Sequence, residues 1–358
     1  MDGRTSARPG LRDLRLADWR PRRRLVVAET DVPVPAVPCV DAHNHLGRWL
    51  TPPGWTAPDV GALLALMDRR HVETVVNLDG MSGDELEANL ERYDHAHPGR
   101  FVTYCQLDWS LLAADDGEAR LAEQLRDSAR RGARGLKVWK TLGLHHRDAS
   151  GALVLPDDER VVRTLALAGD LGLPVTIHVA DPVAFFDPLD ETNERVEELG
   201  ENPDWWFGDR AVHPTFDRLL AALETLVLAT PGTTYVGAHV GCVAEDLDRV
   251  ERLLAAAPNW HVDIGGRVAE LGRQPRRARR LVERWPDRVL FGTDAFPLDD
   301  AALTTHFRFL ETADEAFDYA PGEDVPPQGR WTVSGLHLPP ATLEAVYRGN
   351  ARRLLGLA

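Results

Sequence analysis

Lysine is almost absent from this chain of 358 residues. Of its 41 basic residues, only Lys137 and Lys140 are lysines, and the rest are arginines. Lysine can lose its proton and react at nitrogen, whereas arginine in practice cannot. Two lysines in one short segment therefore indicate positions where arginine does not serve. The alternative is that the composition simply favours arginine and that these two lysines remain by chance.

Cysteines are scarce, and long apolar runs are missing. Cys39, Cys105 and Cys242 are scattered, which suits a reducing cytoplasm and no disulfide framework. No apolar run is long enough to span a membrane, and the Arg-rich N-terminal stretch lacks the apolar segment of a signal peptide. The net charge of -15 argues against a nucleic-acid partner. We therefore expect a cytoplasmic protein that acts on small molecules, with no membrane or nucleic-acid partner.

The order of apolar and amphipathic segments predicts the fold. With 44% hydrophobic and 27% charged residues, the composition is that of a globular protein with a sizeable core. Strands are predicted at 39–45, 72–79, 101–108, 135–140, 174–179, 234–239, 261–265 and 288–294. Amphipathic helical stretches lie between them at 117–131, 158–171, 214–229, 243–257 and 274–285. This alternation predicts an α/β protein, a closed (β/α)8 TIM barrel rather than an open sheet. No Gly-x-Gly-x-x-Gly follows the first strand, which counts against a dinucleotide-binding fold.

Three segments extend the predicted barrel. Residues 1–38 are polar and rich in Arg and Pro, and we expect an arm that packs along the barrel of residues 39–358. The segment 181–215, after the fifth strand, is longer than an ordinary βα loop and contains several aromatic residues. It is either a lid or a helical excursion with its own small core. A helix at 340–355 is expected to close the chain against the barrel.

The first predicted strand carries two histidines near its end. His43 and His45 are two residues apart, so on a strand their side chains share one face with Asp41. Two imidazoles in this arrangement can bind one metal ion without strain. They can equally be two hydrogen-bonded histidines, and the pair alone does not decide between these interpretations.

The other strand ends carry a dense set of polar groups. In a TIM barrel the chemistry lies where the strands end. The groups found there are His43, His45, Asp79, Asp108, Lys137, His178, His239, Arg267 and Asp294. Asp79 and Asp108 are expected to cap helices or orient neighbours rather than react. Each of the others alone has a structural explanation, but all of these explanations would have to hold together for the set to be inert.

These residues lie in motifs that resemble the amidohydrolase superfamily. The motifs are Val-Asp-Ala-His-Asn-His, Gly-Leu-Lys, Thr-Ile-His, Gly-Ala-His-Val-Gly and Phe-Gly-Thr-Asp, in that order along the chain. The resemblance is closest to the amidohydrolase-related branch, which includes aminocarboxymuconate-semialdehyde decarboxylase-like enzymes. It covers the chain from about residue 37 to the C-terminal helix. It implies a TIM barrel but not a substrate, because the branch contains hydrolases, lactonases, decarboxylases and hydratases.

The resemblance also implies a metal site. It assigns the ligands of a divalent ion to His43, His45, His178 and Asp294. Zn²⁺ is expected first, with Mn²⁺ or Fe²⁺ as alternatives, because the ligands mix nitrogen and oxygen. Lys137 matches the position of a carboxylated, metal-bridging lysine in binuclear members. Mononuclear relatives also carry a lysine near this position without that modification, so one ion or two stays open.

The function expected first is a metal-dependent hydrolase. It would activate a metal-bound water to cleave an ester, lactone or amide bond in a small anionic substrate. Asp294 would move the proton, and His239 would hold the water or the developing oxyanion. Lys140, Arg267 or His145 would bind an anionic group of the substrate, and Trp139 would line the mouth of the site.

Two other functions remain open. On the same scaffold, a non-oxidative decarboxylase of an aromatic or unsaturated carboxylic acid would use Asp294 or His239 to protonate the carbon that loses CO2. A binding protein without activity is the third possibility, and the complete set of metal ligands argues against it. Relatives often form dimers, so a homodimer is the expected assembly.

Overall fold

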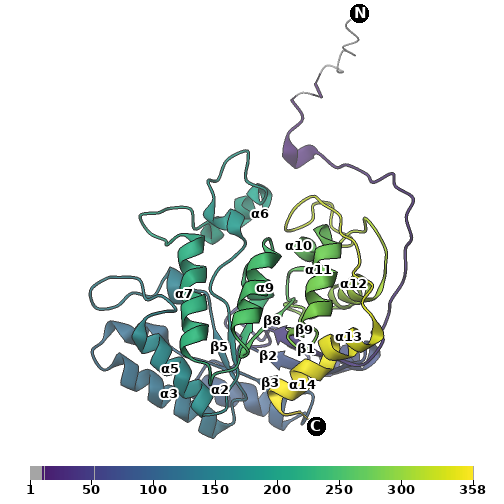
Figure 1. The fold of residues 1–358 in the computed structure, drawn as a ribbon. Helices are drawn as coiled ribbons and strands as arrows, with labels where there is room; N and C mark the ends of the chain where they lie inside the picture. Colours follow the sequence, from purple (N-terminus) through teal and green to yellow (C-terminus); the bar gives the residue numbers. More distant parts are fainter. Residues whose placement is uncertain (1–9, 12, 52, 358) are drawn as a thin grey trace, which may run out of the picture.

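Short parallel strands form the centre of the molecule (Figure 1). The computed structural model describes residues 10–11, 13–51 and 53–357. Its strands are β1 (Cys39–Asn44), β2 (Val72–Asn77), β3 (Phe101–Thr103), β4 (Cys105–Gln106), β5 (Leu136–Val138), β6 (Val175–Ile177), β7 (Tyr235–Gly237), β8 (Trp260–Asp263) and β9 (Val289–Leu290). They pair in parallel in sequence order in two ladders, β1 to β3 and β4 to β9.

Backbone hydrogen bonds close these strands into a barrel. β3 and β4 are two parts of one strand position, interrupted at Tyr104, whose N–H still donates to the Asn77 carbonyl over 2.9 Å. At the seam between the last and first strands, Ala42 N–H donates to the Phe291 carbonyl (3.0 Å) and Asp294 N–H to the His43 carbonyl (2.8 Å). The predicted (β/α)8 barrel is thereby confirmed.

Helices surround the barrel, and most of the predicted ones are present. The described α-helices are α1 (Val60–Arg69), α2 (Gly83–Leu90), α3 (Gly117–Arg131), α4 (Thr141–Leu144), α5 (Glu159–Asp170), α6 (Val196–Glu201), α7 (Phe216–Ala229), α8 (Ala238–Gly241), α9 (Leu247–Ala256), α10 (Val268–Arg273), α11 (Pro275–Arg284), α12 (Asp300–Glu311), α13 (Pro340–Glu344) and α14 (Asn350–Leu355). One π-helical turn, Ala345–Gly349, joins α13 to α14, so the predicted C-terminal helix is continuous.

Capping residues set where several of these helices begin. The side chains of Asp158, Thr215 and Asp299 accept hydrogen bonds from the first-turn N–H groups of α5, α7 and α12. Such bonds satisfy N–H groups that have no partner within the helix. α3 ends at Gly132, whose φ of 110° is left-handed and favours glycine. Local sequence therefore determines where the barrel's helices begin and end.

The C-terminal helix packs at the end of the barrel opposite the long loops. Ala351 and Leu355 of α14 join a buried apolar cluster with side chains of the strands, which are Val40, Ala42, Val76, Leu78, Val102, Tyr104, Val236 and Leu290. In Figure 1, α14 lies below the strands, and α6 lies above them. The polar groups of the strand ends therefore lie at the end of the barrel opposite α14.

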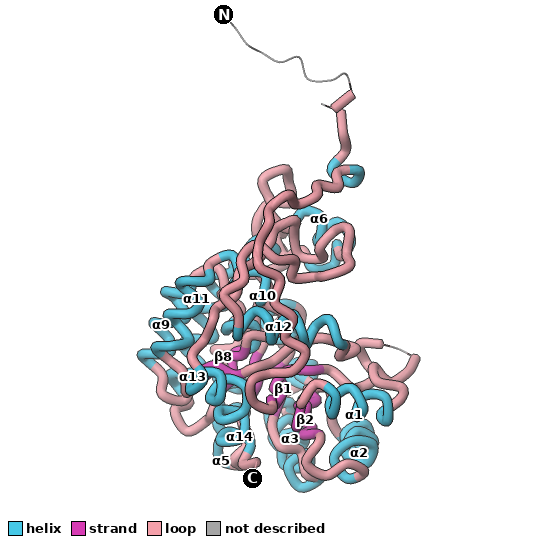
Figure 2. Tube along the Cα trace, turned by 90° about the vertical axis from the view of Figure 1, so that its right-hand side faces the viewer, coloured by secondary structure: helices cyan, strands magenta, loops and turns pink. Residues whose placement is uncertain are grey.

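The N-terminal arm runs along the outside of the barrel (Figure 2). Residues 1–9 and 12 of the predicted arm 1–38 lie outside the described residues. Near its end, Thr30 N–H donates to Asp314 (2.7 Å) and Ala36 N–H to Glu311 (2.8 Å). Further out, Arg330 donates to the carbonyls of Leu16 and Trp19.

The long loop after β6 contains short helices and a small apolar core. Besides α6 it forms 3-10 turns at Val183–Phe186 and Pro203–Trp205. Phe185, Phe186, Leu199 and Phe207 are buried. Within it, the fully buried Arg195 pairs with Glu198 and also with Glu270 of α10, which fastens the loop to the barrel.

None of the helices in the described ranges has both the length and the apolar character needed to cross a bilayer.

The tight contact between Gly135 and Tyr104 gives a test of the barrel's packing. A Cβ atom at Gly135 would lie 2.3 Å from Cζ of the buried Tyr104 ring. We expect Gly135→Ala to lower the free energy of unfolding by about 1–3 kcal/mol, because the ring cannot move without disturbing the core. Urea unfolding followed by circular dichroism measures this change.

Gly232→Ala is the matched control. No heavy atom lies within 4 Å of a Cβ built at Gly232, so its stability is expected to change by less than about 0.5 kcal/mol. Equal stability of the two variants would contradict the packing described here.

Candidate functional site

Three ligand-type side chains converge at the barrel seam. His43 and His45 extend from β1, and Asp294 follows β9. Asp294 Oδ1 lies 3.5 Å from His43 Nε2 and 3.3 Å from His45 Nε2. One ligand atom from each of the three residues lies within 4.8 Å of the other two. The histidines are fully buried, whereas the Asp294 side chain is 20% exposed. This donor set fits a divalent ion.

Two carboxylates hold the backs of these histidines. Asp263 Oδ2 lies 2.9 Å from His43 Nδ1, and Asp79 Oδ1 lies 2.7 Å from His45 Nδ1. Trp49 Nε1–H donates to the same oxygen of Asp79 over 2.7 Å. Each imidazole therefore carries a proton on Nδ1, and its Nε2 faces Asp294. His45 Nε2 has no hydrogen-bond partner within the described part of the chain. This is how metal-ligating histidines are usually held.

The charges of the cluster favour a cation. Burial would lower the pKa of His45, but the carboxylates of Asp79 and Asp294 outweigh it and raise the pKa to about 9. Burial would raise the pKa of Asp294, but His43, His45 and His239 together hold it well below its usual range. The Asp294 carboxylate thus stays ionised, and a proton on His45 compensates its charge. A metal ion can take the place of that proton.

His178 and His239 lie beside this group rather than within it. Their rings are 4.5 Å apart between centroids. Neither nitrogen of His178 has a hydrogen-bond partner among the described residues, although Nε2 is 3.4 Å from Asp181 Oδ1. Burial lowers the pKa of His178 to about 4, so the ring is neutral and keeps a lone pair. His178 is not part of the close cluster of ligand atoms formed by His43, His45 and Asp294.

The backbone is strained at residues that follow two of the strands. His239, Val240 and Asp294 have φ values of 58°, 59° and 56°, in the left-handed region that residues other than glycine rarely adopt. Such strain tends to gather at functional sites. His239 Nδ1 also lies 2.7 Å from the Gly265 carbonyl, which fixes its ring. The last residues of two predicted strands, 234–239 and 288–294, turn in this way and lie beyond the observed β7 and β9.

Lys137 is buried next to the cluster. It is 0% exposed, and its Nζ lies 3.3 Å from His43 Nε2. No carboxylate forms an ion pair with it within the described ranges. Burial lowers the pKa of Lys137, and the nearby carboxylates offset only part of that effect. The amine is therefore neutral more often than an exposed lysine.

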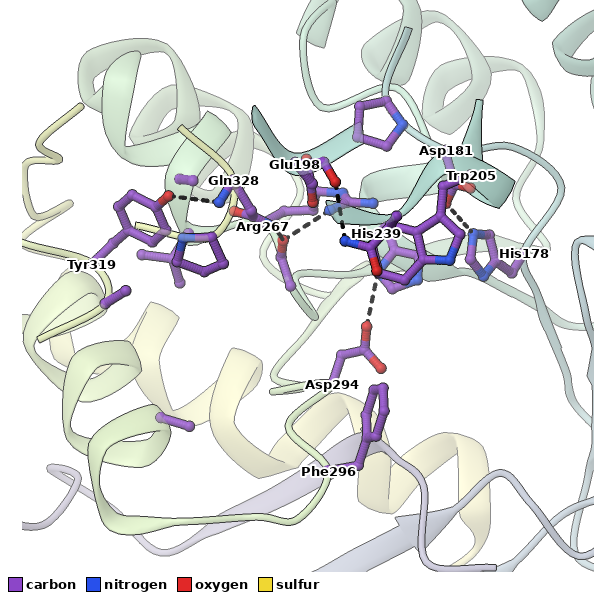
Figure 3. A pocket seen from close by; sticks show the side chains of 18 of the residues that line it. His178, Asp181, Glu198, Trp205, His239, Arg267, Asp294, Phe296, Tyr319 and Gln328 are labelled. Carbon is purple, nitrogen blue, oxygen red and sulfur yellow. Dashed lines mark hydrogen bonds and ion pairs between the residues drawn. The ribbon is translucent and has the colours of Figure 1, made fainter. Parts of the chain in front are cut away.

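A cavity of about 580 Å³ opens on one side of the cluster (Figure 3). His178, His239 and Asp294 line it on one side. The remaining wall is largely apolar and aromatic, and includes Trp139, Phe185, Trp205, Phe296 and Tyr319. A cavity of this size and character suits a small ligand with a flat apolar part.

Two predicted substrate-binding cations line the cavity in different states. Lys140 forms an ion pair with the buried Asp181, so its charge is compensated. Arg267 is only 8% exposed and donates to the Gly266 carbonyl over 2.9 Å. No ion pair of Arg267 occurs among the residues that the structure describes. Its guanidinium is therefore the cation best placed to bind an anionic ligand.

Two of the sequence candidates belong neither to the cluster nor to the cavity lining. Asp108 is exposed and caps the 3-10 turn Trp109–Ala113 by accepting from Ser110 N–H, as its position suggested. His145 packs against Phe207 and His213 instead of lining the cavity. Sequence reasoning missed Asp263 and Asp181. An acidic residue within the apolar strand 261–265 was the only signal for Asp263.

Comparisons with known proteins agree with this barrel fold. The profile of a family described as Amidohydrolase matches residues 40–357. No curated protein matches the chain. A 2,6-dihydroxybenzoate decarboxylase from Rhizobium is similar to it with a TM-score of 0.53 and 15% identity, over 90% of this chain and 99% of that one.

Two further solved structures carry metals. One is a dihydroxybenzoic acid decarboxylase from Polaromonas with bound manganese and the inhibitor 2-nitroresorcinol (TM-score 0.53, 13% identity, covering 90% of this chain and 97% of that one). The other is an amidohydrolase from Burkholderia multivorans with bound zinc (TM-score 0.50, 16% identity, covering 90% and 100%). At these identities the likeness concerns the fold alone.

Replacing the carboxylate behind His45 tests the metal site. We expect Asp79→Asn to lower zinc affinity by about 10- to 100-fold, because the neutral amide holds the imidazole less firmly and makes it less basic. Titration of the purified protein in competition with a chelator measures the dissociation constant.

Asp108→Asn is the matched control, since it removes an equal charge at another strand end. Its zinc affinity should equal that of the wild type. Unchanged affinity in Asp79→Asn would contradict the proposed role of the carboxylate.

Proposed function

This chain belongs to the amidohydrolase family, and on that basis we propose that it is a metal-dependent enzyme that removes CO2 from a small aromatic or unsaturated carboxylic acid. The proposal is carried by three features that occur together: a cluster of His and Asp ligands, a largely aromatic cavity, and a buried guanidinium that has no ion pair with any described residue. Two of the similar structures are decarboxylases of hydroxylated benzoic acids, which supports the same choice.

His43, His45 and Asp294 would hold the metal, with His178 moving in as a fourth ligand. Their mixed nitrogen and oxygen atoms suit Zn²⁺, Mn²⁺ or Fe²⁺. When bound, the ion supplies a fixed positive charge that attracts and orients anionic oxygens of the substrate. Asp79 and Asp263 keep the two imidazoles in place whether or not the substrate is present.

Arg267 and the aromatic wall would orient the substrate. A guanidinium donates two parallel hydrogen bonds to a carboxylate, and both are stronger in a buried site. The flat apolar part of the substrate would pack against side chains such as Trp139 and Phe296. Trp139 also lies edge-on to His45 and His178, at 5.4 and 5.3 Å between ring centroids, so its ring stands next to the cluster.

The reaction requires one proton transfer. The bond between the carboxyl carbon and its neighbour breaks, the electron pair stays on the remaining carbon, and that carbon takes a proton while CO2 leaves. Asp294 is the group best placed to relay this proton from solvent to the carbon, because its carboxylate is ionised and is the exposed member of the cluster. His239 donates a hydrogen bond from Nδ1 to the Gly265 carbonyl, which leaves its Nε2 free to exchange a proton. Its Nδ1 also lies 3.8 Å from Asp294 Oδ2.

Hydrolysis of an ester, lactone or amide is the second candidate. The family description and the zinc-containing amidohydrolase among the similar structures favour it. Asp294 and His239 would then take a proton from water instead of giving one to carbon. The two functions differ in their products, so one assay separates them.

Turnover of aryl carboxylates tests the proposal. We expect the zinc- or manganese-loaded protein to release CO2 from hydroxybenzoates and, in D2O, to place deuterium on the carbon that carried the carboxyl group. Chelation of the metal should abolish release, and Asp294→Asn should slow it by at least about 100-fold. Hydrolysis of esters or lactones with ¹⁸O incorporation from water, and no CO2, would favour the second candidate instead.

Loss of the buried guanidinium should weaken substrate binding. We expect Arg267→Gln to raise KM for a carboxylate substrate by about 10- to 100-fold, because hydrogen bonds to a charged group are lost. Arg276→Gln removes the same charge from an exposed position on α11 and should leave KM unchanged. Steady-state kinetics of both variants would contradict the assignment if their KM values agreed.

A further inference from the structure

His306 is a buried polar residue of the cavity that the proposed mechanism does not use. It lies on α12, and Ala302, Thr305 and His306 of this helix face the cavity together. The side chain comes from a helix, outside the set of strand-end residues. His306 is 6% exposed, so more than nine-tenths of it is buried.

The hydrogen bonding of His306 fixes its tautomer. Nδ1 lies 2.7 Å from the Ala302 carbonyl, which can only accept, so Nδ1 carries the proton. Nε2 therefore presents a lone pair and can only accept a hydrogen bond. Nε2 is buried and has no partner in the part of the chain that the structure describes. Burial also lowers the pKa of His306, which keeps the ring neutral.

An unpaired acceptor in this position needs a partner. Buried polar atoms of native proteins are nearly always hydrogen-bonded, and an unpaired one costs free energy. The two nitrogens of an imidazole point in widely different directions, so Nε2 points away from the helix carbonyl that holds Nδ1. The ring itself packs edge-on against Phe291, at 5.9 Å between centroids. An apolar side chain would fill this space without leaving an acceptor unsatisfied.

The polar groups of the cavity differ in what they offer a ligand. Arg267 can only donate hydrogen bonds, and neutral His306 can only accept at Nε2. A ligand that satisfies both therefore needs an acceptor, such as a carboxylate, and a separate donor. The rest of the lining is mostly apolar, with further polar groups at Glu198, Asn202 and Gln328.

We propose that His306 Nε2 accepts a hydrogen bond from a hydroxyl or N–H group of the substrate, and that the substrate is a carboxylic acid bearing such a donor. Only one part of this inference, the carboxylic acid group of the substrate, rests on the proposed function. His306 is a specificity residue: it selects against analogues in which the donor is methylated or missing, because these leave its lone pair unpaired.

A pair of matched ligands tests this role without relying on turnover. The probes are resorcinol and 1,3-dimethoxybenzene, which have the same ring and differ in their donors. Binding to the zinc-loaded full-length protein is measured by calorimetry. We expect wild type to bind resorcinol more tightly, and His306→Phe to reduce the ratio of the two affinities by about 5- to 150-fold. His306→Gln, which keeps an acceptor, should restore part of the ratio.

Thr304→Val is the control on the same helix, since Thr304 bonds to the Asp300 carbonyl and does not line the cavity. Its ratio should equal that of wild type. An unchanged ratio in His306→Phe, or no binding of either probe to wild type, would overturn the inference. If His306→Phe does not fold, wild type and His306→Gln still decide: no preference for resorcinol in wild type overturns it.

The outcome is separable from that of the proposed function. A protein that releases CO2 but whose affinity ratio does not depend on His306 retains the decarboxylase proposal and loses this inference. A protein whose affinity ratio depends on His306 but which releases no CO2 retains this inference and loses the decarboxylase proposal.

Discussion

Two hydrogen bonds between a carboxylate and an imidazole are the constraint on which this site depends. Asp79 holds His45, and Asp263 holds His43. Without them, each ring could rotate or exchange its proton between nitrogens, and the two Nε2 atoms would no longer face Asp294. The carboxylates belong to β8 and to the residues just after β2, so the barrel itself fixes the orientation of the rings. Burying so much charge is unfavourable, and only close pairing of opposite charges makes it tolerable.

The general plan of the molecule could be predicted from the sequence, because it depends on local patterns. Alternating strands and helices are recorded in short stretches of residues, and parallel strands always end on the same side of a barrel. This rule predicts that His43, His45, Asp79 and Asp294 lie near one another, and the structure brings them together. The ends of the strands predicted at 234–239 and 288–294 lie too late in the sequence, because the left-handed turns at His239 and Asp294 leave no mark in the pattern.

The supporting residues could not be found in this way. Asp263 acts on His43 because only β9 separates β8 from β1 around the barrel, a relation between segments more than 200 residues apart. His306 lies on a helix, and the state of its ring is set by the carbonyl one turn earlier. The scarcity of lysine was informative all the same. Lys137 is fully buried beside His43, and Lys140 lies against Asp181 in the cavity wall, so neither is an ordinary surface residue.

The seam of the barrel has a consequence for how the protein matures. Asp294 N–H bonds to the His43 carbonyl, so the first and last strands meet where their side chains would share an ion. During synthesis, a chain that has emerged only as far as β8 has both histidines and lacks Asp294. An ion held by all three side chains would therefore bind with full affinity only after closure, and its binding would stabilise the closed chain over partly folded ones. Such an ion would link the two ends of the barrel, and its loss would weaken the barrel first at this seam.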